Sequence, residues 1–188
     1  MRIVAGSLRG RRLVAPKGHS TRPTADRTRQ ALFNVLEHAP WSSGLADARI
    51  LDLFAGAGAL GLEALSRGAG FCLFVERTEA ACRAIADNVE ALALTERARV
   101  RRRDVALLGA RGQADGPPFD LAFLDPPYGQ GLGEAALARL AAGGWLAPKA
   151  VAVLERGAGD LAAPTPRFTL LDERAWGAAR VAFLQWSP

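Results

Sequence analysis

The sequence of 188 residues predicts an open, doubly wound α/β fold. Short apolar runs alternate with segments of helical periodicity, which is typical of βαβ units that build a mostly parallel sheet covered on both faces. The last two apolar runs have no helix between them, and this predicts a closing antiparallel hairpin. Hydrophobic residues make up 49% of the chain, enough for one core, and the length indicates one compact domain.

The N-terminal end predicts a hairpin and a helix that precede the alternating pattern. Apolar patches at residues 3–5 and 13–14 flank a basic turn that contains glycine, which predicts a β-hairpin. Thr24 is suited to cap a helix that runs through His38. Asp26 lies in the first turn of this helix, where an acid interacts favourably with the helix dipole.

The alternating pattern assigns the remaining elements. We expect strands at residues 50–54, 71–75, 99–101, 121–124 and 151–154. We expect helices at residues 59–67, 78–93, 104–110 and 133–142. The closing hairpin is expected from residues 168–171 and 180–186. The chain therefore divides into an N-terminal extension, residues 1–40, and a main domain, residues 41–188.

The basic charge of the chain is concentrated at its N-terminus. The formal net charge is +5, but residues 1–30 hold eight Lys and Arg against one acid, which leaves −2 for residues 31–188. A basic segment on a neutral body is typical of a protein that binds a polyanion. No apolar run approaches the length of a membrane span and no signal peptide pattern opens the chain, so we expect a cytoplasmic protein.

A glycine-rich turn follows the first predicted strand of the main domain. Gly56, Gly58 and Gly61 fit the spacing G-x-G-x-x-G, which permits a tight turn and lets a ligand approach the free N–H groups of the next helix. This spacing alone is compatible with a nicotinamide cofactor. Asp52 lies four residues before the first glycine, where its charge would repel a pyrophosphate and favour a cationic ligand.

Two more acids follow predicted strands in the same way. Glu76 ends the run 71–75 and is placed to accept hydrogen bonds from both hydroxyls of a ribose. Asp104 follows the strand at 99–101 and is placed to accept one from an adenine amine. Taken singly, each acid is equally well explained as a favourable charge at a helix N-terminus. Together with Asp52, their positions in successive βα units predict a nucleoside site.

The next strand ends in the motif Asp125-Pro126-Pro127-Tyr128. Two prolines cannot donate to a strand ladder, so they end the strand and stiffen the turn. The Asp125 carboxylate and the Pro126 carbonyl are then fixed acceptors beside an aromatic ring. This arrangement suits the exocyclic amine of a nucleic-acid base, because hydrogen bonds to both N–H groups would localise the nitrogen lone pair while the base stacks on Tyr128.

These motifs resemble those of the S-adenosylmethionine-dependent methyltransferases that act on amino groups of nucleic-acid bases. Further similarity, to the ribosomal RNA small subunit methyltransferase D family, lies in residues 2–6, 9–11, 22–27, 32–34 and 58–68. The resemblance covers essentially the whole chain. Two positions depart from the family pattern: Gln30 stands where a glutamate is expected, and Trp176 lies in a segment expected as Lys-x-aromatic-Gly.

The resemblance implies a Rossmann-like class I methyltransferase fold. It implies methyl transfer from S-adenosylmethionine to the N2 amine of a guanine in 16S ribosomal RNA, with S-adenosylhomocysteine as product and no metal. The residues implied in catalysis are Asp125, Pro126, Pro127 and Tyr128. Those implied in cofactor binding are Asp52, Phe54, Ala55, Gly56, Gly58, Leu60, Glu76, Arg77, Asp104 and Val105. Those implied in RNA binding are Arg9, Arg11, Arg12, Lys17, Arg22, Thr24 and Arg27.

Three alternative functions stay open from the sequence. The motif at 125–128 also fits methylation of adenine N6 in RNA or DNA. An NAD-dependent oxidoreductase would use the three glycines but leave that motif and the basic N-terminus unexplained. A non-catalytic RNA-binding protein of ribosome assembly would leave the acids without a role. We expect a monomer that acts on 16S ribosomal RNA, free or within an assembling small subunit, and no membrane partner.

Overall fold

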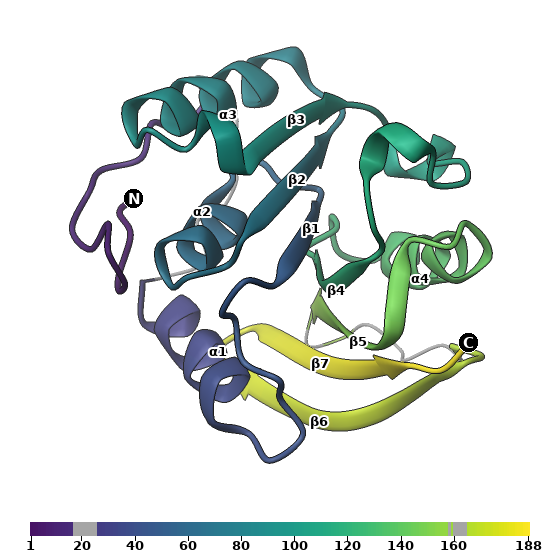
Figure 1. Cartoon of the computed structure of the whole chain (residues 1–188). Helices are drawn as coiled ribbons and strands as arrows, with labels where there is room; N and C mark the ends of the chain where they lie inside the picture. Colours follow the sequence, from purple (N-terminus) through teal and green to yellow (C-terminus); the bar gives the residue numbers. More distant parts are fainter. Residues whose placement is uncertain (17–25, 158, 160–164) are drawn as a thin grey trace.

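A computed structural model describes residues 1–16, 26–157, 159 and 165–188. Its seven-stranded sheet has the order β3-β2-β1-β4-β5-β7-β6 (Figure 1). The strands are β1 (Arg49–Leu53), β2 (Phe71–Glu76), β3 (Ala98–Arg102), β4 (Phe119–Leu124), β5 (Leu146–Gly157), β6 (Phe168–Trp176) and β7 (Ala179–Trp186). The α-helices are α1 (Asp26–His38), α2 (Ala59–Ser66), α3 (Glu79–Ala91) and α4 (Leu132–Ala142). The predicted α/β fold, with its closing hairpin, is confirmed.

The pairing of the strands determines where a ligand site forms. Strands β1 to β5 pair in parallel, whereas β7 pairs antiparallel with both β5 and β6. The order reverses at β1, since β2 lies on one side of it and β4 on the other. In open α/β sheets, ligands bind outside the carboxyl ends of the strands at such a switch point.

The two faces of the sheet are covered by different helices. Alternate residues of a strand point to opposite faces, so Ile50 and Leu51 belong to two separate cores. Helices α1, α2 and α3 pack in the first core and α4 packs in the second (Figure 1). Among the described residues, no helix is long and apolar enough to cross a membrane.

The prediction of an α-helix at residues 104–110 is wrong. Only Val105–Leu107 form a turn of 3-10 helix, which Asp104 caps by accepting a hydrogen bond from the Ala106 amide at 2.8 Å. The helix does not continue past Leu108, which has extended backbone angles of φ −68° and ψ 113°. The Gly109 carbonyl that follows accepts a hydrogen bond from the Trp145 indole at 2.8 Å. That carbonyl is therefore committed to a tertiary contact.

The N-terminal segment forms the predicted hairpin only in a minimal form, with a single antiparallel bridge between Arg2 and Arg12 and no extended strands. The Ile3 amide donates to the Arg11 carbonyl and the Leu13 amide to the Met1 carbonyl, both at 3.0 Å. The backbone amides of Val4 and Ala5 instead donate to the Glu63 carboxylate of α2, at 2.8 and 2.9 Å. A carboxylate that accepts two successive amides competes with a strand ladder for the same donors. The segment is therefore held against α2.

A buried ion-pair cluster around Glu63 fastens α1 to the same place. Arg29 of α1 is fully buried, donates to Asp26 at 2.9 Å and lies 3.6 Å from the Glu63 carboxylate. Arg67 donates to Glu63 from the other side at 2.8 Å. Arg2 also pairs with Asp26, at 3.1 Å. Part of the N-terminal positive charge is therefore structural and not free for a polyanion.

Substitution of Arg29 tests the importance of this cluster. R29A removes the buried guanidinium that Asp26 and Glu63 share, while Arg67 still pairs with Glu63 and Arg2 with Asp26. Breaking a buried pair costs about 3–5 kcal/mol of unfolding free energy. The matched control is R83A, which removes an exposed pair with Glu79 within α3 and should cost less than about 1 kcal/mol. Urea unfolding measures both, and equal losses would show that the cluster does not stabilise the fold.

Candidate active site

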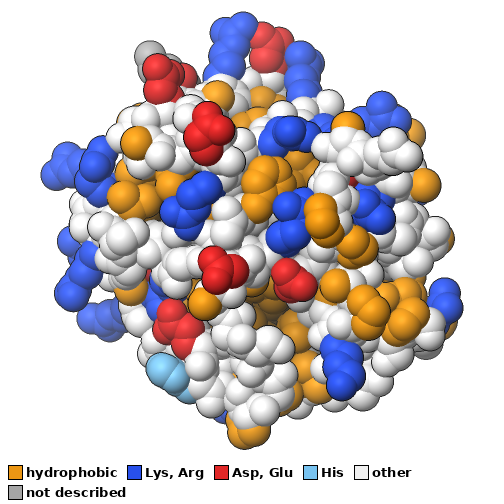
Figure 2. Space-filling view, viewed as in Figure 1, with side chains coloured by type: hydrophobic (Ala, Val, Ile, Leu, Met, Phe, Trp, Pro, Cys, Tyr) orange, Lys and Arg blue, Asp and Glu red, His pale blue; other side chains and the backbone are white. Residues whose placement is uncertain are grey.

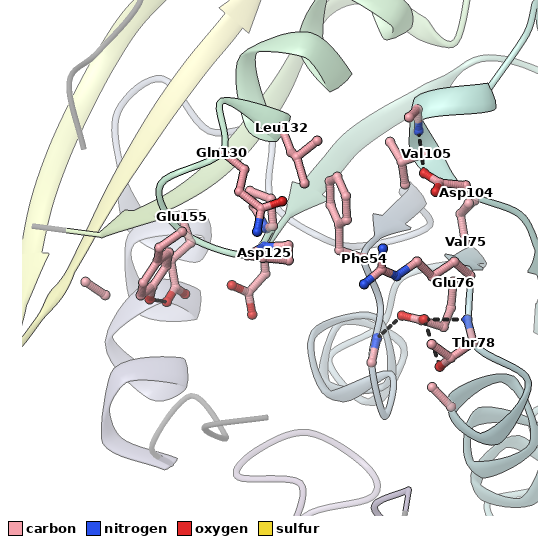
Figure 3. Close-up of a pocket in the computed structure, with 18 of the residues that line it drawn as sticks. Phe54, Val75, Glu76, Thr78, Asp104, Val105, Asp125, Gln130, Leu132 and Glu155 are labelled. Atoms are coloured by element: carbon pink, nitrogen blue, oxygen red, sulfur yellow. Dashed lines mark hydrogen bonds between the residues drawn. The ribbon is translucent and has the colours of Figure 1, made fainter. Parts of the chain in front are cut away.

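A cavity of about 1050 Å³ opens at the carboxyl ends of the parallel strands (Figure 3). Sites for one small molecule typically measure ~300–1,000 Å³, so this cavity is at the upper end of that range. Its wall comes from the ends of β2, β4 and β5, from the segments after β1 and β3, and from the tip of the β6–β7 hairpin.

The glycine-rich turn between β1 and α2 contains two kinds of glycine. Gly56 lines the cavity at φ +55°, and a Cβ built there would meet no atom nearer than 4.0 Å. Gly61 lies within α2, where a Cβ would overlap the Phe74 ring and the Cys72 sulfur. The first glycine therefore leaves an open place in the cavity wall, whereas the third allows the helix to pack on the strand.

Phe54 links this turn to the strand before it in an unusual conformation. It lines the cavity with φ +58°, a left-handed value that is rare for a bulky side chain and persists where the surroundings impose it. The next amide, of Ala55, donates to the Val75 carbonyl of β2 at 3.2 Å. The turn is therefore held in a shape that keeps its backbone facing the cavity.

Asp52 lies beneath the cavity and is not among the residues that line it. It is 2% exposed and accepts a hydrogen bond from the Gly61 amide at 2.9 Å. Burial raises the pKa of Asp52 to about 8; the Gly61 bond opposes this shift, and the charges of Asp125 and Glu76 add to it. Its predicted role beside a cationic ligand would be exerted from below the wall.

Glu76 is a buried carboxylate that is fixed on the wall by three donors. One oxygen accepts the Thr78 amide at 2.8 Å and its hydroxyl at 3.0 Å, and the other accepts the Gly56 amide at 3.1 Å (Figure 3). Because these donors belong to two different turns, the orientation of Glu76 is set before any ligand arrives. Asp104 and the buried Val105 line the same side of the cavity.

The motif that ends β4 lies on the other side of the cavity, and all four of its residues line it (Figure 3). Asp125 is half-buried, Pro126 is buried, and Tyr128 is 46% exposed. Burial and the neighbouring charge of Glu155 raise the pKa of Asp125 to about 7. This carboxyl group therefore changes its protonation state near neutral pH.

Glu155, at the end of β5, is a site residue that the sequence reasoning missed. It is buried, lines the cavity, and accepts a hydrogen bond from the Tyr128 hydroxyl at 2.6 Å. This bond fixes the direction of the tyrosine ring. Glu155 directly follows the apolar run 151–154, as Glu76 directly follows the run 71–75. An acid immediately after a predicted strand is therefore the sequence pattern that identifies Glu155 as a candidate.

The cavity wall contains some of the predicted cofactor residues and not others. Those that line it are Phe54, Gly56, Glu76, Arg77, Asp104 and Val105. Those that do not line it are Asp52, Ala55, Gly58 and Leu60. Gly58 precedes α2 with φ +77° and donates to the Ala55 carbonyl at 2.7 Å, so both residues shape the turn from behind.

The predicted RNA-binding residues are dispersed. Arg27 of α1 lines the cavity, as does Arg103, which the sequence reasoning missed. Arg11 donates to the Ala91 carbonyl at the end of α3, at 2.6 Å. The remaining described members, Arg9 and Arg12, are exposed and do not line the cavity. The predictions for Lys17, Arg22 and Thr24 lie outside the described residues.

The two positions that depart from the expected family pattern, Gln30 and Trp176, lie in different parts of the fold. Gln30 is on α1, donates to the Asn34 side chain at 2.7 Å and accepts from Arg67 at 3.3 Å. It therefore takes part in the packing of α1 on α2. Trp176 lies at the tip of the β6–β7 hairpin and contributes to the cavity wall.

The wall as a whole is rich in acceptors. Glu76 and Asp104 lie on the side nearest β2 and β3, and Asp125 and Glu155 lie on the side of β4 and β5 (Figure 3). In the space-filling view, basic side chains are scattered over this face, and acidic and hydrophobic side chains lie near its centre (Figure 2). Such a wall favours ligands that carry hydrogen-bond donors or positive charge, and the aromatic rings beside it favour planar ones.

Comparison with known proteins identifies relatives over nearly the full length. The family model described as conserved hypothetical protein 95 matches residues 1–185. Ribosomal RNA small subunit methyltransferase D of Escherichia coli (strain K12) is 39% identical over 155 residues, which cover 82% of this chain and 74% of that protein. The Haemophilus influenzae protein of the same name is 35% identical over 178 residues, covering 94% and 89%.

Solved structures agree with the sequence comparison. The structure of yhhF from Escherichia coli is 34% identical with a TM-score of 0.83, covering 100% of this chain and 98% of that one. A hypothetical protein from a Thermus species is 34% identical with a TM-score of 0.77, covering 97% and 98%. These comparisons show that the chain belongs to the conserved hypothetical protein 95 family, that of ribosomal RNA small subunit methyltransferase D.

Proposed function

We propose that this protein transfers a methyl group from S-adenosylmethionine to the exocyclic N2 amine of a guanine in 16S ribosomal RNA. The names of its relatives support ribosomal RNA as the substrate class. The observation that carries the proposal is the end of β4, where Asp125, Pro126 and Tyr128 line one side of a cavity whose other side holds Glu76. The cavity thus presents a nucleoside site and an amine site together.

The side of the cavity nearest β1 to β3 fits S-adenosylmethionine. Glu76 and Asp104 offer acceptors that backbone amides hold in place, which suits the ribose hydroxyls and the adenine amine. Gly56 leaves the space that a ligand needs to approach the backbone. Asp52 lies beneath with a pKa raised to about 8, so it is largely protonated in the empty site, and a bound cation would favour its ionised form. When bound, S-adenosylmethionine supplies an electrophilic methyl group on a sulfonium.

The residues at the end of β4 would orient the target amine. The Asp125 carboxylate and the Pro126 carbonyl each accept one N–H of the exocyclic amine, and Tyr128 stacks on the base. A flipped base costs a few kcal/mol in lost stacking and pairing, which these contacts offset. With both N–H groups held, the nitrogen lone pair is directed away from the base plane and toward the cofactor side.

Asp125 also provides a destination for the proton that the amine releases. Methylation leaves a positively charged nitrogen that must lose one proton to give the neutral product. The raised pKa of Asp125, about 7, allows its carboxylate to hold that proton until water removes it. Water can also accept the proton directly, so Asp125 acts first as an orienting acceptor.

The direct test of this function is nucleoside mass analysis of 16S ribosomal RNA from cells that lack the gene. We expect N2-methylguanosine to be missing and to return when the purified protein acts on that RNA. D125A should fail to restore it, because alanine has no side-chain acceptor for the N–H of the target amine. Undiminished N2-methylguanosine in the deletion strain contradicts the proposal, and missing N6-methyladenosine refutes the guanine assignment.

A pair of glycine substitutions tests the cofactor side. G56A places a methyl group in the open part of the wall and should weaken S-adenosylmethionine binding by about 10- to 100-fold. G61A should leave the affinity of the folded protein nearly unchanged and cost about 1–3 kcal/mol of unfolding free energy, because its Cβ overlaps Phe74. Calorimetric titration and urea unfolding separate the two effects, and the reverse pattern would refute the assignment of Gly56.

The pH dependence of methyl transfer tests the role of Asp125. The acceptor is the ionised form, and the raised pKa leaves the group protonated below about pH 7. We therefore expect kcat/KM to rise about tenfold per pH unit below that value and to level off above it. In E155Q the midpoint should fall, because the negative charge that helps to raise the pKa is gone. A flat profile between pH 6 and 8 would refute this role.

A further inference from the structure

The register of β4 with β5 places Asp125 and Glu155 side by side. Leu124 pairs with Leu154, so the two acids are the next residues on neighbouring parallel strands. Such strands lie about 4.8 Å apart, and residues in register point to the same face of the sheet. Both side chains line the cavity, and Figure 3 shows them on the same side of it. Two carboxyl groups therefore face one ligand.

Glu155 has an oxygen that remains available to that ligand. The side chain is 9% exposed, and Oε1 accepts the hydrogen bond from Tyr128. No hydrogen bond or ion pair from a described residue reaches Oε2. The adjacent Arg156 does not neutralise it, because its guanidinium pairs with Glu134 and Glu173 instead. Among the described residues, Oε2 is not one of the fully buried side-chain atoms that lack a partner, so it is accessible from the cavity. A ligand that covers this oxygen and excludes water must supply a donor to it, because an unpaired buried carboxylate oxygen is costly.

The two purine bases differ in what they offer to such a pair. Guanine carries an N1–H next to its N2 amine, so its edge presents adjacent donors to adjacent acceptors. Adenine carries its amine beside an unprotonated N1, which is an acceptor. A carboxylate opposite that nitrogen repels it, and neither partner gains a hydrogen bond.

We infer that Glu155 is a specificity-determining residue that accepts the N1–H of guanine while Asp125 holds the N2 amine. This inference rests on the proposed function and extends it from the amine to the whole edge of the base. The two oxygens of Glu155 then have different partners: Oε1 accepts from the Tyr128 hydroxyl, and Oε2 accepts from the N1–H of guanine. A base without the N1 proton would leave Oε2 desolvated and unpaired, which is an effective way to reject a close analogue.

The test compares two RNA substrates at the nucleotide that the deletion strain leaves unmodified. One carries guanine there, and the other carries 2-aminopurine, which keeps the exocyclic amine but lacks the N1 proton. Hydrogen bonds to charged groups predict that the wild-type protein prefers guanine by about 10- to 100-fold in kcat/KM. In E155Q this ratio should collapse to near unity, because glutamine can accept from guanine N1–H or donate to the N1 of 2-aminopurine.

Y128F serves as the matched control, because it removes the hydroxyl that Glu155 accepts and leaves both carboxylates in place. We expect it to lower kcat/KM for both substrates alike and to keep the ratio, as loss of ring orientation alone would. An unchanged ratio in E155Q overturns the role of Glu155 in reading N1. Absence of methyl transfer to the guanine substrate by the wild-type protein overturns the proposed function itself.

Discussion

The candidate site depends on one constraint: strands that run parallel end at the same edge of the sheet. Asp52, Glu76, Asp125 and Glu155 lie at or beside the carboxyl ends of β1, β2, β4 and β5, and the fold brings them around one cavity. Their burial and mutual repulsion raise the pKa values of Asp52 and Asp125. Backbone amides of the glycine-rich turn offset part of that cost. The remaining acceptors favour ligands that carry donors or positive charge, as a sulfonium nucleoside and a base amine do.

The buried cluster around Glu63 connects this edge to the N-terminal extension. Glu63 binds the amides of the first segment and lies beside Arg29 of α1, so α1 is fixed against α2. The first turn of α1 carries Arg27 and Thr28 onto the cavity wall. The basic N-terminus therefore has a structural part, which holds α1 in place, and an exposed part that faces solvent.

Local patterns predicted much of this molecule, and the errors arise where distant residues decide. The alternation of apolar runs and helices predicted the sheet, and the acids after strands predicted Glu76 and the motif at 125–128. The expected N-terminal hairpin is limited to one bridge, because the amides of Val4 and Ala5 donate to Glu63, some sixty residues away. Glu155 also follows an apolar run, but its place beside Asp125 comes from the register of β4 with β5, which no local pattern contains.

The central claim is that the two sides of the cavity have separate roles, with cofactor binding near Glu76 and base orientation near Asp125. Calorimetric titration with S-adenosylhomocysteine tests it most directly, because this product lacks the sulfonium charge and so removes long-range attraction to Asp125. E76Q should weaken binding by about 10- to 100-fold, while D125N should bind as the wild-type protein does. Equal loss in both variants, or loss in D125N alone, would contradict the account.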